Sequence, residues 1–385
     1  MGIARLLYLN SFTNSIADSE ASDEIGYGIT ANKAIKDQLL RLGYEIYEIP
    51  NQSATNIKRV SDNERRKAKL QWIQECYQQI LSLDLTNYDA ICFFHIFHQF
   101  PCEIKRILLD LGLSRIKLLG YTLGSHWDPT DIYRFIAHPG MHLVDLANLY
   151  CLDKIFAVTD YFRDVLITSL KQFNNDLANE INRKITVVGL PINATYIDRF
   201  RTVKTQNEVI IVFNHAPIES KRPDVLFRII EPFLDEYHHL RLVVTRRFYP
   251  HSPGAQLLNR LAEKFGDRII LGNTLPLHQY FDILWKANLQ ISTSEHESLG
   301  ISTLEAMYTN NCCLLPNRCS YPEVVGPVYE ALYSSESELI DKLHHFITDA
   351  DHRISVASKL RERAELYVPE VVAYKIHLSI QDALS

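Results

Sequence analysis

The sequence lacks the patterns that mark several large classes of protein. Its seven cysteines are scattered and show no CxxC spacing, which indicates reduced thiols in a cytosolic protein rather than a disulfide framework or a zinc site. The longest stretches that are mainly apolar, such as residues 116–121, are far shorter than a membrane span. The N-terminus has no charged segment followed by a long apolar one, so no secretory leader is expected. Peripheral membrane contact stays an open alternative; an integral segment does not.

Positive charge is not in excess either. The formal net charge is −6 and the isoelectric point is near 6.2, which argues against a surface evolved to hold a nucleic-acid backbone. One local exception is the basic stretch at residues 63–69, NERRKAK, which opens a helix. It is interpreted as a solvated helix face, with an anionic membrane surface or an RNA acceptor as the alternatives.

The features that are present predict two α/β domains. The chain has 385 residues, with 46% apolar and 22% charged residues, and this length is typical of two domains. Short apolar runs alternate with helix-period segments throughout, and this alternation predicts parallel sheets covered by helices. The expected strands are residues 5–9, 44–49, 90–95, 116–121, 154–158 and 185–188, followed by a second series at 209–213, 240–245, 268–271, 289–292 and 312–315. The expected helices between and after them are residues 31–42, 64–81, 161–173, 223–237, 257–265, 277–287 and 370–384.

Two such series predict two Rossmann-like, doubly wound domains that face each other across a cleft. We expect the first domain to cover residues 1–200 and the second residues 201–366, with residues 367–385 forming a helix that crosses back to the first domain. No repeat, low-complexity tract or long linker interrupts the chain. Because ligands of open α/β sheets bind at the carboxyl ends of the strands, the active site is expected there.

The segment richest in chemistry is residues 289–326, LQISTSEHESLGISTLEAMYTNNCCLLPNRCSYPEVVG. An apolar strand ends in a polar turn that carries Glu297, and a helix is expected to begin near Ile301 and to contain Glu305. Between the two acids, the first-turn amides of Gly300, Ile301, Ser302 and Thr303 are expected to have no intrahelical acceptor. Free amides at the positive end of a helix dipole are suited to a phosphate. Gly300 lets the backbone approach a ligand closely.

This segment resembles the E-x7-E signature of retaining GT-B glycosyltransferases, in particular glycosyltransferase family 4. The resemblance rests on Glu297 and Glu305 with SLGISTLEAM around them, and it continues in order along nearly the whole chain, through residues 152–166 and 185–200. Gly26 and Gly28 occupy the place of the family's glycine-rich loop, and His126, in LGYTLGSHWDP, that of a cleft histidine. Thr274 and Leu275 stand where backbone groups of the family hold the base.

The resemblance implies transfer of a hexose from a nucleoside diphosphate sugar (a UDP- or GDP-sugar) to an acceptor hydroxyl, with retention of configuration. The resemblance also implies that Glu297, His126 and Lys221 act at the reacting sugar and phosphates, that Glu305 binds the ribose, and that no metal or other cofactor is required. The alternatives without a functional role are a solvated loop acid for Glu297, an exposed lysine for Lys221 and a loop histidine that is hydrogen-bonded within the protein for His126. Glu323 is interpreted as structural.

One position departs from the family pattern. Family members carry an arginine and, five positions later, a lysine after the first strand of the second domain, and here Lys221 matches while Ala216 stands in the arginine position. His215, Arg222 and the pair Arg246-Arg247 are candidates to supply the missing charge. If none does, phosphate binding depends on Lys221 and the helix N-terminus alone. The departure at Ala216 leaves a nucleotide-sugar-binding partner subunit without turnover as an alternative.

A narrower resemblance is to the tRNA-queuosine mannosyltransferase group. It rests on a shared pattern, here Ser292-Thr293, His296-Glu297, Gly300, Leu304-Glu305-Ala306, Tyr308, Pro316-Asn317-Arg318 and Tyr321-Pro322-Glu323. The first domain does not show that group's N-terminal pattern. The acceptor therefore stays open between a glycan, a lipid, a small molecule and tRNA.

Overall fold

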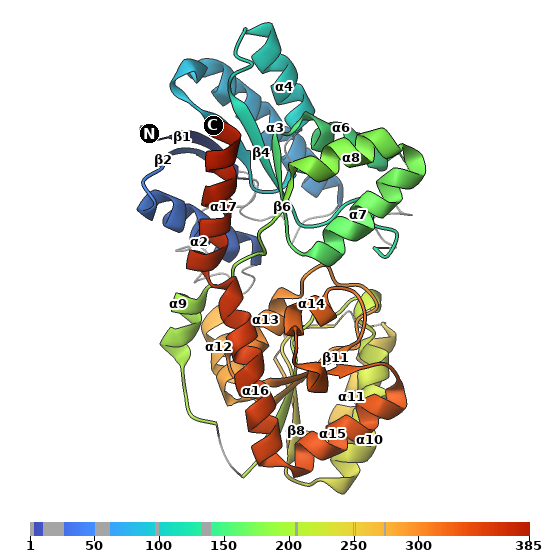
Figure 1. Cartoon of the computed structure of the whole chain (residues 1–385). Coiled ribbons are helices and arrows are strands. Elements are labelled where there is room, and N and C mark those ends of the chain that lie inside the picture. Colours follow the sequence, from blue (N-terminus) through green and yellow to red (C-terminus); the bar gives the residue numbers. More distant parts are fainter. Residues whose placement is uncertain are drawn as a thin grey trace. The chain divides into compact units, whose positions relative to one another are not determined.

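A computed structural model describes residues 4–10, 27–50, 62–96, 100–131, 140–204, 207–248, 250, 252–272 and 275–385. The chain forms two units (Figure 1). The described residues up to Pro191, together with Pro369–Ser385, make the first unit, and Ile192–Val368 makes the second. Residues 192–200, which the sequence assigns to the first domain, belong to the second unit, where the Trp285 indole donates to the Ile197 carbonyl over 2.9 Å.

The first unit is built on a parallel sheet. Within the described residues, six strands lie in the order β2-β1-β3-β4-β5-β6, and every neighbouring pair is parallel. The strands are apolar and buried, as in β1 (Arg5–Asn10), because helices cover the sheet. The remaining elements are α2 (Tyr27–Arg41), β2 (Glu45–Pro50), α3 (Asp62–Ser82), β3 (Ala90–Phe93), α4 (Pro101–Asp110), β4 (Lys117–Thr122), α6 (Met141–Cys151), β5 (Lys154–Ala157), α7 (Asp160–Phe173), α8 (Asn175–Lys184), β6 (Ile185–Val187) and α17 (Pro369–Leu384).

The C-terminal helix α17 packs against α2 and β5 of the first unit. Its inward face carries Val372, Ala373, Ile376 and Ile380, all buried. An ion pair between Lys154 and Asp382, 2.5 Å long, joins the end of α17 to β5. The last helix is thus an integral layer of the first unit, although the second unit precedes it in the chain.

The second unit repeats the design. In the part that the structure describes, its six strands lie in the order β12-β11-β10-β7-β8-β9, again all parallel, with helices on both sides of the sheet (Figure 1). Its elements are α9 (Ala194–Ile197), β7 (Val209–Phe213), α10 (Pro223–Glu236), β8 (Leu240–Val244), α11 (Pro253–Phe265), β9 (Ile269–Leu271), α12 (Leu277–Lys286), β10 (Leu289–Ile291), α13 (Ile301–Tyr308), β11 (Cys312–Pro316), α14 (Tyr321–Val325), β12 (Leu332–Tyr333), α15 (Glu336–Thr348) and α16 (Ala350–Ala364).

The strand order of the second unit contains a switch point between β7 and β10. From β7 the chain proceeds outward through β8 and β9, and it then returns to place β10 on the other side of β7. Connections that leave a sheet in opposite directions open a crevice at the carboxyl ends of those two strands. Polar residues follow both strands here: Asn214 and His215 after β7, and Ser292 and Thr293 after β10. The fold therefore places the predicted chemistry at the switch point.

The prediction of two doubly wound α/β domains is confirmed. All eleven expected strands are present within two residues of their predicted ends. The elements that were not among those expected are β12 and the helices α4, α6, α8, α9, α14, α15 and α16. The seven cysteines are free thiols. No described helix has the length and apolar character that crossing a membrane requires.

Candidate functional site

Two loops form the site at the switch point of the second unit. One runs from β7 to α10 and the other from β10 to α13, and hydrogen bonds fasten them together. The Glu295 amide donates to the Ser220 carbonyl over 2.8 Å. The Thr293 hydroxyl lies 3.0 Å from the Lys221 carbonyl oxygen and 2.7 Å from that of Arg222. These contacts fix the two loops, and with them the backbone positions of Lys221 and Glu297.

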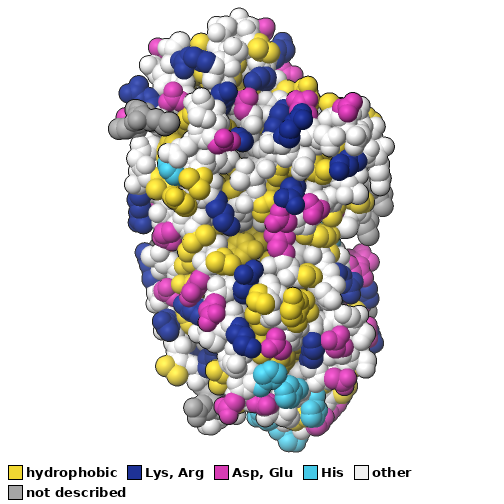
Figure 2. Space-filling view, viewed as in Figure 1, with side chains coloured by type: hydrophobic (Ala, Val, Ile, Leu, Met, Phe, Trp, Pro, Cys, Tyr) yellow, Lys and Arg dark blue, Asp and Glu magenta, His cyan; other side chains and the backbone are white. Residues whose placement is uncertain are grey.

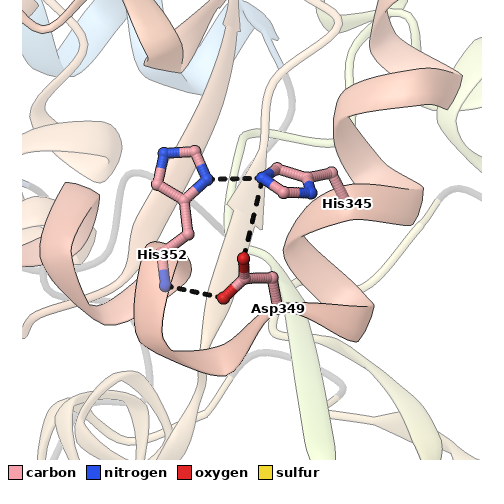
Figure 3. A group of neighbouring side chains, drawn as sticks. All are labelled: His345, Asp349 and His352. Carbon is pink, nitrogen blue, oxygen red and sulfur yellow. Dashed lines mark hydrogen bonds and ion pairs between the residues drawn. The ribbon is translucent and has the colours of Figure 1, made fainter.

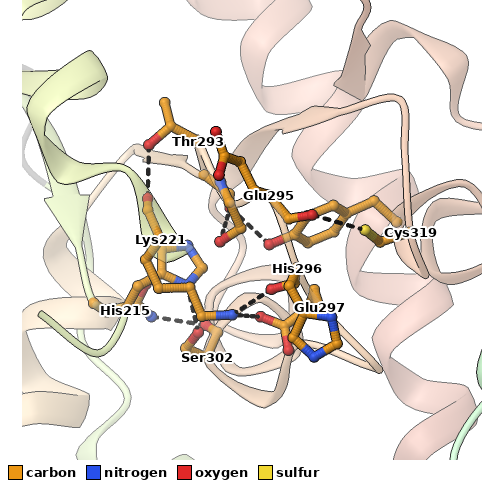
Figure 4. A network of polar contacts seen from close by, with 12 residues as sticks. His215, Lys221, Thr293, Glu295, His296, Glu297, Ser302 and Cys319 are labelled. Carbon is orange, nitrogen blue, oxygen red and sulfur yellow. Dashed lines mark hydrogen bonds and ion pairs between the residues drawn. The ribbon is translucent and has the colours of Figure 1, made fainter. Parts of the chain in front are cut away.

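Lys221 and Glu297 form an ion pair at the centre of this site (Figure 4). The Lys221 Nζ donates to Glu297 Oε2 over 2.8 Å and to the His296 carbonyl oxygen over 2.7 Å. Only 12% and 15% of the two side chains are exposed. Burial acts to raise the pKa of Glu297, but the adjacent Lys221 charge and its hydrogen bond outweigh burial and hold that pKa below its usual value. The Glu297 carboxylate is therefore ionised at neutral pH.

Helix α13 begins at Ile301, as predicted, and Gly300 precedes it. Gly300 has φ +87°, in the left-handed region, and a Cβ there would lie 3.3 Å from Cγ of Glu297, so only glycine fits without strain. Among the described residues, the amides of Gly300, Ile301 and Ser302 donate to no protein acceptor. The expectation of a free amide is wrong for Thr303, whose N–H donates to the Gly300 carbonyl over 3.0 Å.

Glu305 lies one turn further along α13. It accepts a hydrogen bond of 2.6 Å from the Tyr280 hydroxyl on α12. Burial raises the pKa of Glu305 to about 7, while the Tyr280 hydrogen bond and the Arg246 charge act in the opposite direction. The Arg246 guanidinium lies 5.8 Å from the centre of the Tyr280 ring. Arg246 is thus the cation of the Glu305 side of the site, as Lys221 is of the Glu297 side.

His215 is buried between α13 and β10. Its Nδ1 lies 3.0 Å from the Ser302 hydroxyl (Figure 4), and its Nε2 lies 2.6 Å from the Gln290 amide. Burial, aided by the Lys221 charge, lowers the pKa of His215 to about 3. The ring is neutral at physiological pH and contributes hydrogen bonds without positive charge.

Because His215 is neutral, the positive charge missing at Ala216 must come from one of the three arginines that the sequence offers, Arg222, Arg246 or Arg247. Arg222 is engaged by Asp224 over 3.1 Å and by Glu295 over 2.5 Å. Arg246 follows β8 and reaches the Glu305 side of the site, while Arg247 is exposed. The geometry thus favours Arg246 as the second cation of this site, beside Lys221.

His126 belongs to the first unit, in the loop after β4. Its Nδ1 lies 2.9 Å from Oδ2 of Asp145, and its backbone N–H donates to the same oxygen over 2.7 Å. Asp145 is buried on α6, and burial raises its pKa although bonds from His126 and Ser125 counteract this. The neighbouring Trp127 helps to line a cavity of about 620 Å³ together with Tyr161 and Phe173. His126 itself is not among the residues that line this cavity.

The remaining predicted positions are less informative. Gly28 lies in the first turn of α2; Gly26 and Thr274 fall outside the described residues. The Leu275 side chain packs on Gly272, where a Cβ would approach it within 2.9 Å.

Sequence reasoning missed three polar residues of the site. Asn214 donates to the Ser302 carbonyl over 2.7 Å and to the Tyr280 hydroxyl over 3.1 Å, and Gln290 contacts His215 from β10. Asn214 directly follows a strand, which is a detectable signal. Tyr280 lies on the apolar face of a helix and Gln290 inside a buried strand, where nothing in the sequence separates them from the core.

Comparisons with known proteins support the fold. No family model matches the chain. The structure is similar to sucrose-phosphate synthase from Thermosynechococcus elongatus (TM-score 0.68, 12% identity, 98% of each chain). It is also similar to a UDP-forming trehalose-phosphate synthase from Burkholderia xenovorans (TM-score 0.66, 11% identity, 100% of each chain) and to Anabaena HepE in complex with UDP (TM-score 0.63, 13% identity, 99% of this chain and 100% of that one). The chain has the GT-B fold, as the sequence resemblance implies.

Part of the chain is also similar in sequence to a known enzyme. The chain is 23% identical over 181 residues to the tRNA-queuosine alpha-mannosyltransferase of Drosophila melanogaster. The match covers 44% of this chain and 46% of that protein, so it spans less than half the length of the relative.

Proposed function

We propose that the protein is a retaining glycosyltransferase that moves a hexose from a nucleoside diphosphate sugar to an acceptor hydroxyl. The observation that carries this proposal is the pair of acids on either side of the α13 N-terminus. Glu297 is paired with Lys221, Glu305 lies near Arg246, and free amides of α13 lie between them. The glycosyltransferase fold and the UDP bound to Anabaena HepE support the proposal.

Each group has a role in this assignment. The amides of Gly300, Ile301 and Ser302 bind the diphosphate at the positive end of α13. Lys221 has three N–H donors, and two of them reach Glu297 and His296, so the third is available for a phosphate oxygen. Glu297 accepts hydrogen bonds from sugar hydroxyls, and Glu305 accepts them from the ribose diol.

Transfer breaks the bond between the anomeric carbon and the diphosphate oxygen and forms one to the acceptor oxygen. The acceptor proton passes to the departing diphosphate oxygen, so no separate base is required. The protein contributes positioning and electrostatic stabilisation of the leaving diphosphate. We propose no metal for this step. His126 would act at the sugar or the acceptor. We also propose a cytoplasmic location, with peripheral membrane contact as the alternative.

The first experiment identifies the donor. A thermal-shift panel of UDP-, GDP- and ADP-sugars is expected to raise the melting temperature with one nucleotide class, because a bound donor stabilises by mass action. In the presence of that donor, Glu297→Ala is expected to abolish transfer while the protein remains folded. Asp282→Asn, which alters an exposed acid paired with Lys286 on α12, serves as the control. Unimpaired turnover by Glu297→Ala would refute the assignment.

A narrower candidate is mannose transfer from GDP-mannose to queuosine in tRNA. The match to the Drosophila enzyme favours it. It predicts that GDP-mannose is the stabilising donor and that the protein incorporates mannose into queuosine-containing tRNA but not into tRNA lacking queuosine. Incorporation into neither tRNA, with transfer to another acceptor, would reject this candidate and leave the general proposal standing.

The alternative without turnover is a nucleotide-sugar-binding partner subunit, and Ala216 favours it. The enzyme and the non-catalytic subunit differ in hydrolysis of the donor, because a protein that only binds the nucleotide sugar does not hydrolyse it. Slow release of sugar from the stabilising donor, lost in Glu297→Ala, would support the enzyme.

A further inference from the structure

Two histidines and an aspartate gather where α15 ends and α16 begins, apart from the residues of the donor site. His345 lies in the last turn of α15, Asp349 caps α16, and His352 lies in its first turn (Figure 3). Histidine side chains also gather on the face shown in Figure 2, over the end of the second unit that carries α15. We propose that His345, Asp349 and His352 bind a divalent transition-metal ion, and that zinc is the ion that suits this donor set.

The three ligand atoms are already close to one another. Nε2 of His345 lies 2.6 Å from Nδ1 of His352 and 4.0 Å from Oδ2 of Asp349, and all three atoms fall within 4.8 Å of one another. Zinc binds nitrogen and carboxylate oxygen at about 2.0–2.2 Å in a tetrahedron, which separates its ligand atoms by roughly 3.3 Å. To reach this spacing, the two nitrogens must move apart by about 0.7 Å and the oxygen must approach Nε2 of His345 by about 0.7 Å. The distance from the oxygen to Nδ1 of His352, at most 4.8 Å, must shorten by no more than about 1.5 Å.

The backbone holds the ligands in position before any ion arrives. Asp349 accepts the His352 amide through Oδ1 over 2.9 Å, which leaves Oδ2 turned towards His345 (Figure 3). The Asp349 amide in turn donates to the His345 carbonyl over 2.8 Å. The helix break thus fixes the aspartate relative to both histidines, as hydrogen-bonded neighbours commonly orient metal ligands.

The local charge also suits a dication. Two neutral imidazoles and one carboxylate carry a single negative charge, and nitrogen ligands favour zinc over magnesium or calcium. The Arg353 guanidinium is directed away, to the carbonyls of Phe346 and Ile347 at the end of α15.

The side chains are accessible from solvent. The exposed fractions are 52% for His345 and 44% for Asp349, so an ion can enter and water can complete the coordination. The two facing nitrogens lie 2.6 Å apart, so the ring whose facing nitrogen carries the hydrogen must adopt its other tautomer before both nitrogens can bind an ion. A bound ion would join the end of α15 to the start of α16, and α16 packs on α13 and β11.

The test uses the full-length protein, stripped with a chelator and titrated with zinc against a chromophoric competitor. Wild-type protein is expected to bind a single ion at this group. His345→Asn and His352→Asn should weaken binding by about tenfold or more. Asp349→Asn keeps an oxygen for the α16 cap and removes only the charge, so it too should weaken binding with no change in melting temperature of the metal-free protein. His344→Asn, altering an adjacent exposed histidine that packs near Tyr237, is the matched control and should bind as wild type.

Cobalt provides the second readout. Bound cobalt should give the visible absorption of a tetrahedral nitrogen and oxygen site in wild type and in His344→Asn, and not in His345→Asn. Equal zinc affinity in wild type and His345→Asn would overturn the proposal, as would the intense near-ultraviolet band of sulfur ligation from one of the free cysteines.

Discussion

The Lys221 ammonium lies 2.8 Å from the Glu297 carboxylate, and the two residues come from loops 76 positions apart in the sequence. The pair is largely buried, so each charge depends on the other. Lys221 keeps Glu297 ionised, and Glu297 keeps a cation beside the free amides of α13. Under the proposed function, the ammonium of this pair would bind the phosphates of the donor and the carboxylate would bind its sugar.

Replacing Lys221 should therefore damage both binding and stability. Lys221→Met removes the phosphate-binding ammonium and leaves Glu297 without its cation, which is expected to cost about 1–3 kcal/mol of unfolding free energy at neutral pH. Isothermal titration with the nucleoside diphosphate should show a dissociation constant raised by about tenfold or more. Lys286→Met, on an exposed face of α12, should change neither quantity. An unaltered dissociation constant in Lys221→Met would remove the lysine from the phosphate site.

The same pair predicts how the variant depends on pH. Because the pKa of Glu297 is depressed in the folded state, its stabilising contribution is present above the unfolded value of 4.5 and is lost as pH falls through the folded pKa. The difference in melting temperature between wild type and Lys221→Met should be largest at neutral pH and should shrink below pH 4.5. A difference that stays constant from pH 7 to pH 3 would show that the loss reflects packing rather than the ion pair.

Glu305 should couple donor binding to proton release. Its pKa is raised to about 7 by burial, so the folded protein binds more protons than the unfolded chain between its ordinary value and that pH. Stability should consequently fall as pH rises through this range. If the ribose diol donates to the ionised carboxylate, donor binding should tighten from pH 6 to pH 8 and release a proton. Titration calorimetry in buffers of different ionisation enthalpy measures that proton, and Glu305→Gln should abolish the release.

Tyr280 should set the pKa of Glu305. Its hydroxyl donates to Glu305 over 2.6 Å and accepts from Asn214 over 3.1 Å. Tyr280→Phe should destabilise the protein by about 1 kcal/mol, because Asn214 loses a partner. In the wild type this hydrogen bond lowers the pKa of Glu305. Its loss should therefore raise that pKa and move the pH midpoint of donor binding upward. The exposed Tyr329 supplies the control, Tyr329→Phe, and a midpoint that is the same in both variants would deny Tyr280 this role.

The architecture was predictable because it depends on local patterns. Buried parallel strands are short apolar runs, and the alternation with helices identifies them regardless of the rest of the fold. β12 escaped because Leu332–Tyr333 is too short for any periodicity. The boundary at Ile192 also escaped, because it depends on tertiary contacts such as that of Trp285 with the Ile197 carbonyl.

The sequence indicated candidate site residues only where polar residues or glycine stand in a turn after a strand. Glu297, Gly300 and Lys221 stand in loops at strand ends, where polar residues indicate a ligand. The neutrality of His215 was not predictable, since it follows from burial between α13 and β10. Nor was the pairing of Arg246 with the Glu305 side, because it depends on how β8 and α12 lie beside each other. The sequence therefore indicated candidate residues in the loops, whereas the contacts of Asn214, Tyr280 and Gln290 and the charge of His215 depend on the fold.

A comparison of Gly300 with Gly140 separates two effects of a substitution, the strain of a left-handed backbone and the loss of space beside Glu297. Both glycines precede a helix with nearly the same φ, +87° and +86°, but a Cβ at Gly300 would lie 3.3 Å from Cγ of Glu297, whereas one at Gly140 would meet nothing within 4 Å. Both alanine variants should lose about 1–2 kcal/mol of stability, the cost of a left-handed non-glycine residue. Only Gly300→Ala should also weaken donor binding, because its methyl group displaces Glu297 and crowds the amides of α13. Thermal unfolding and donor titration of the two variants side by side measure this, and equal losses of donor affinity would mean that Gly300 serves the backbone alone.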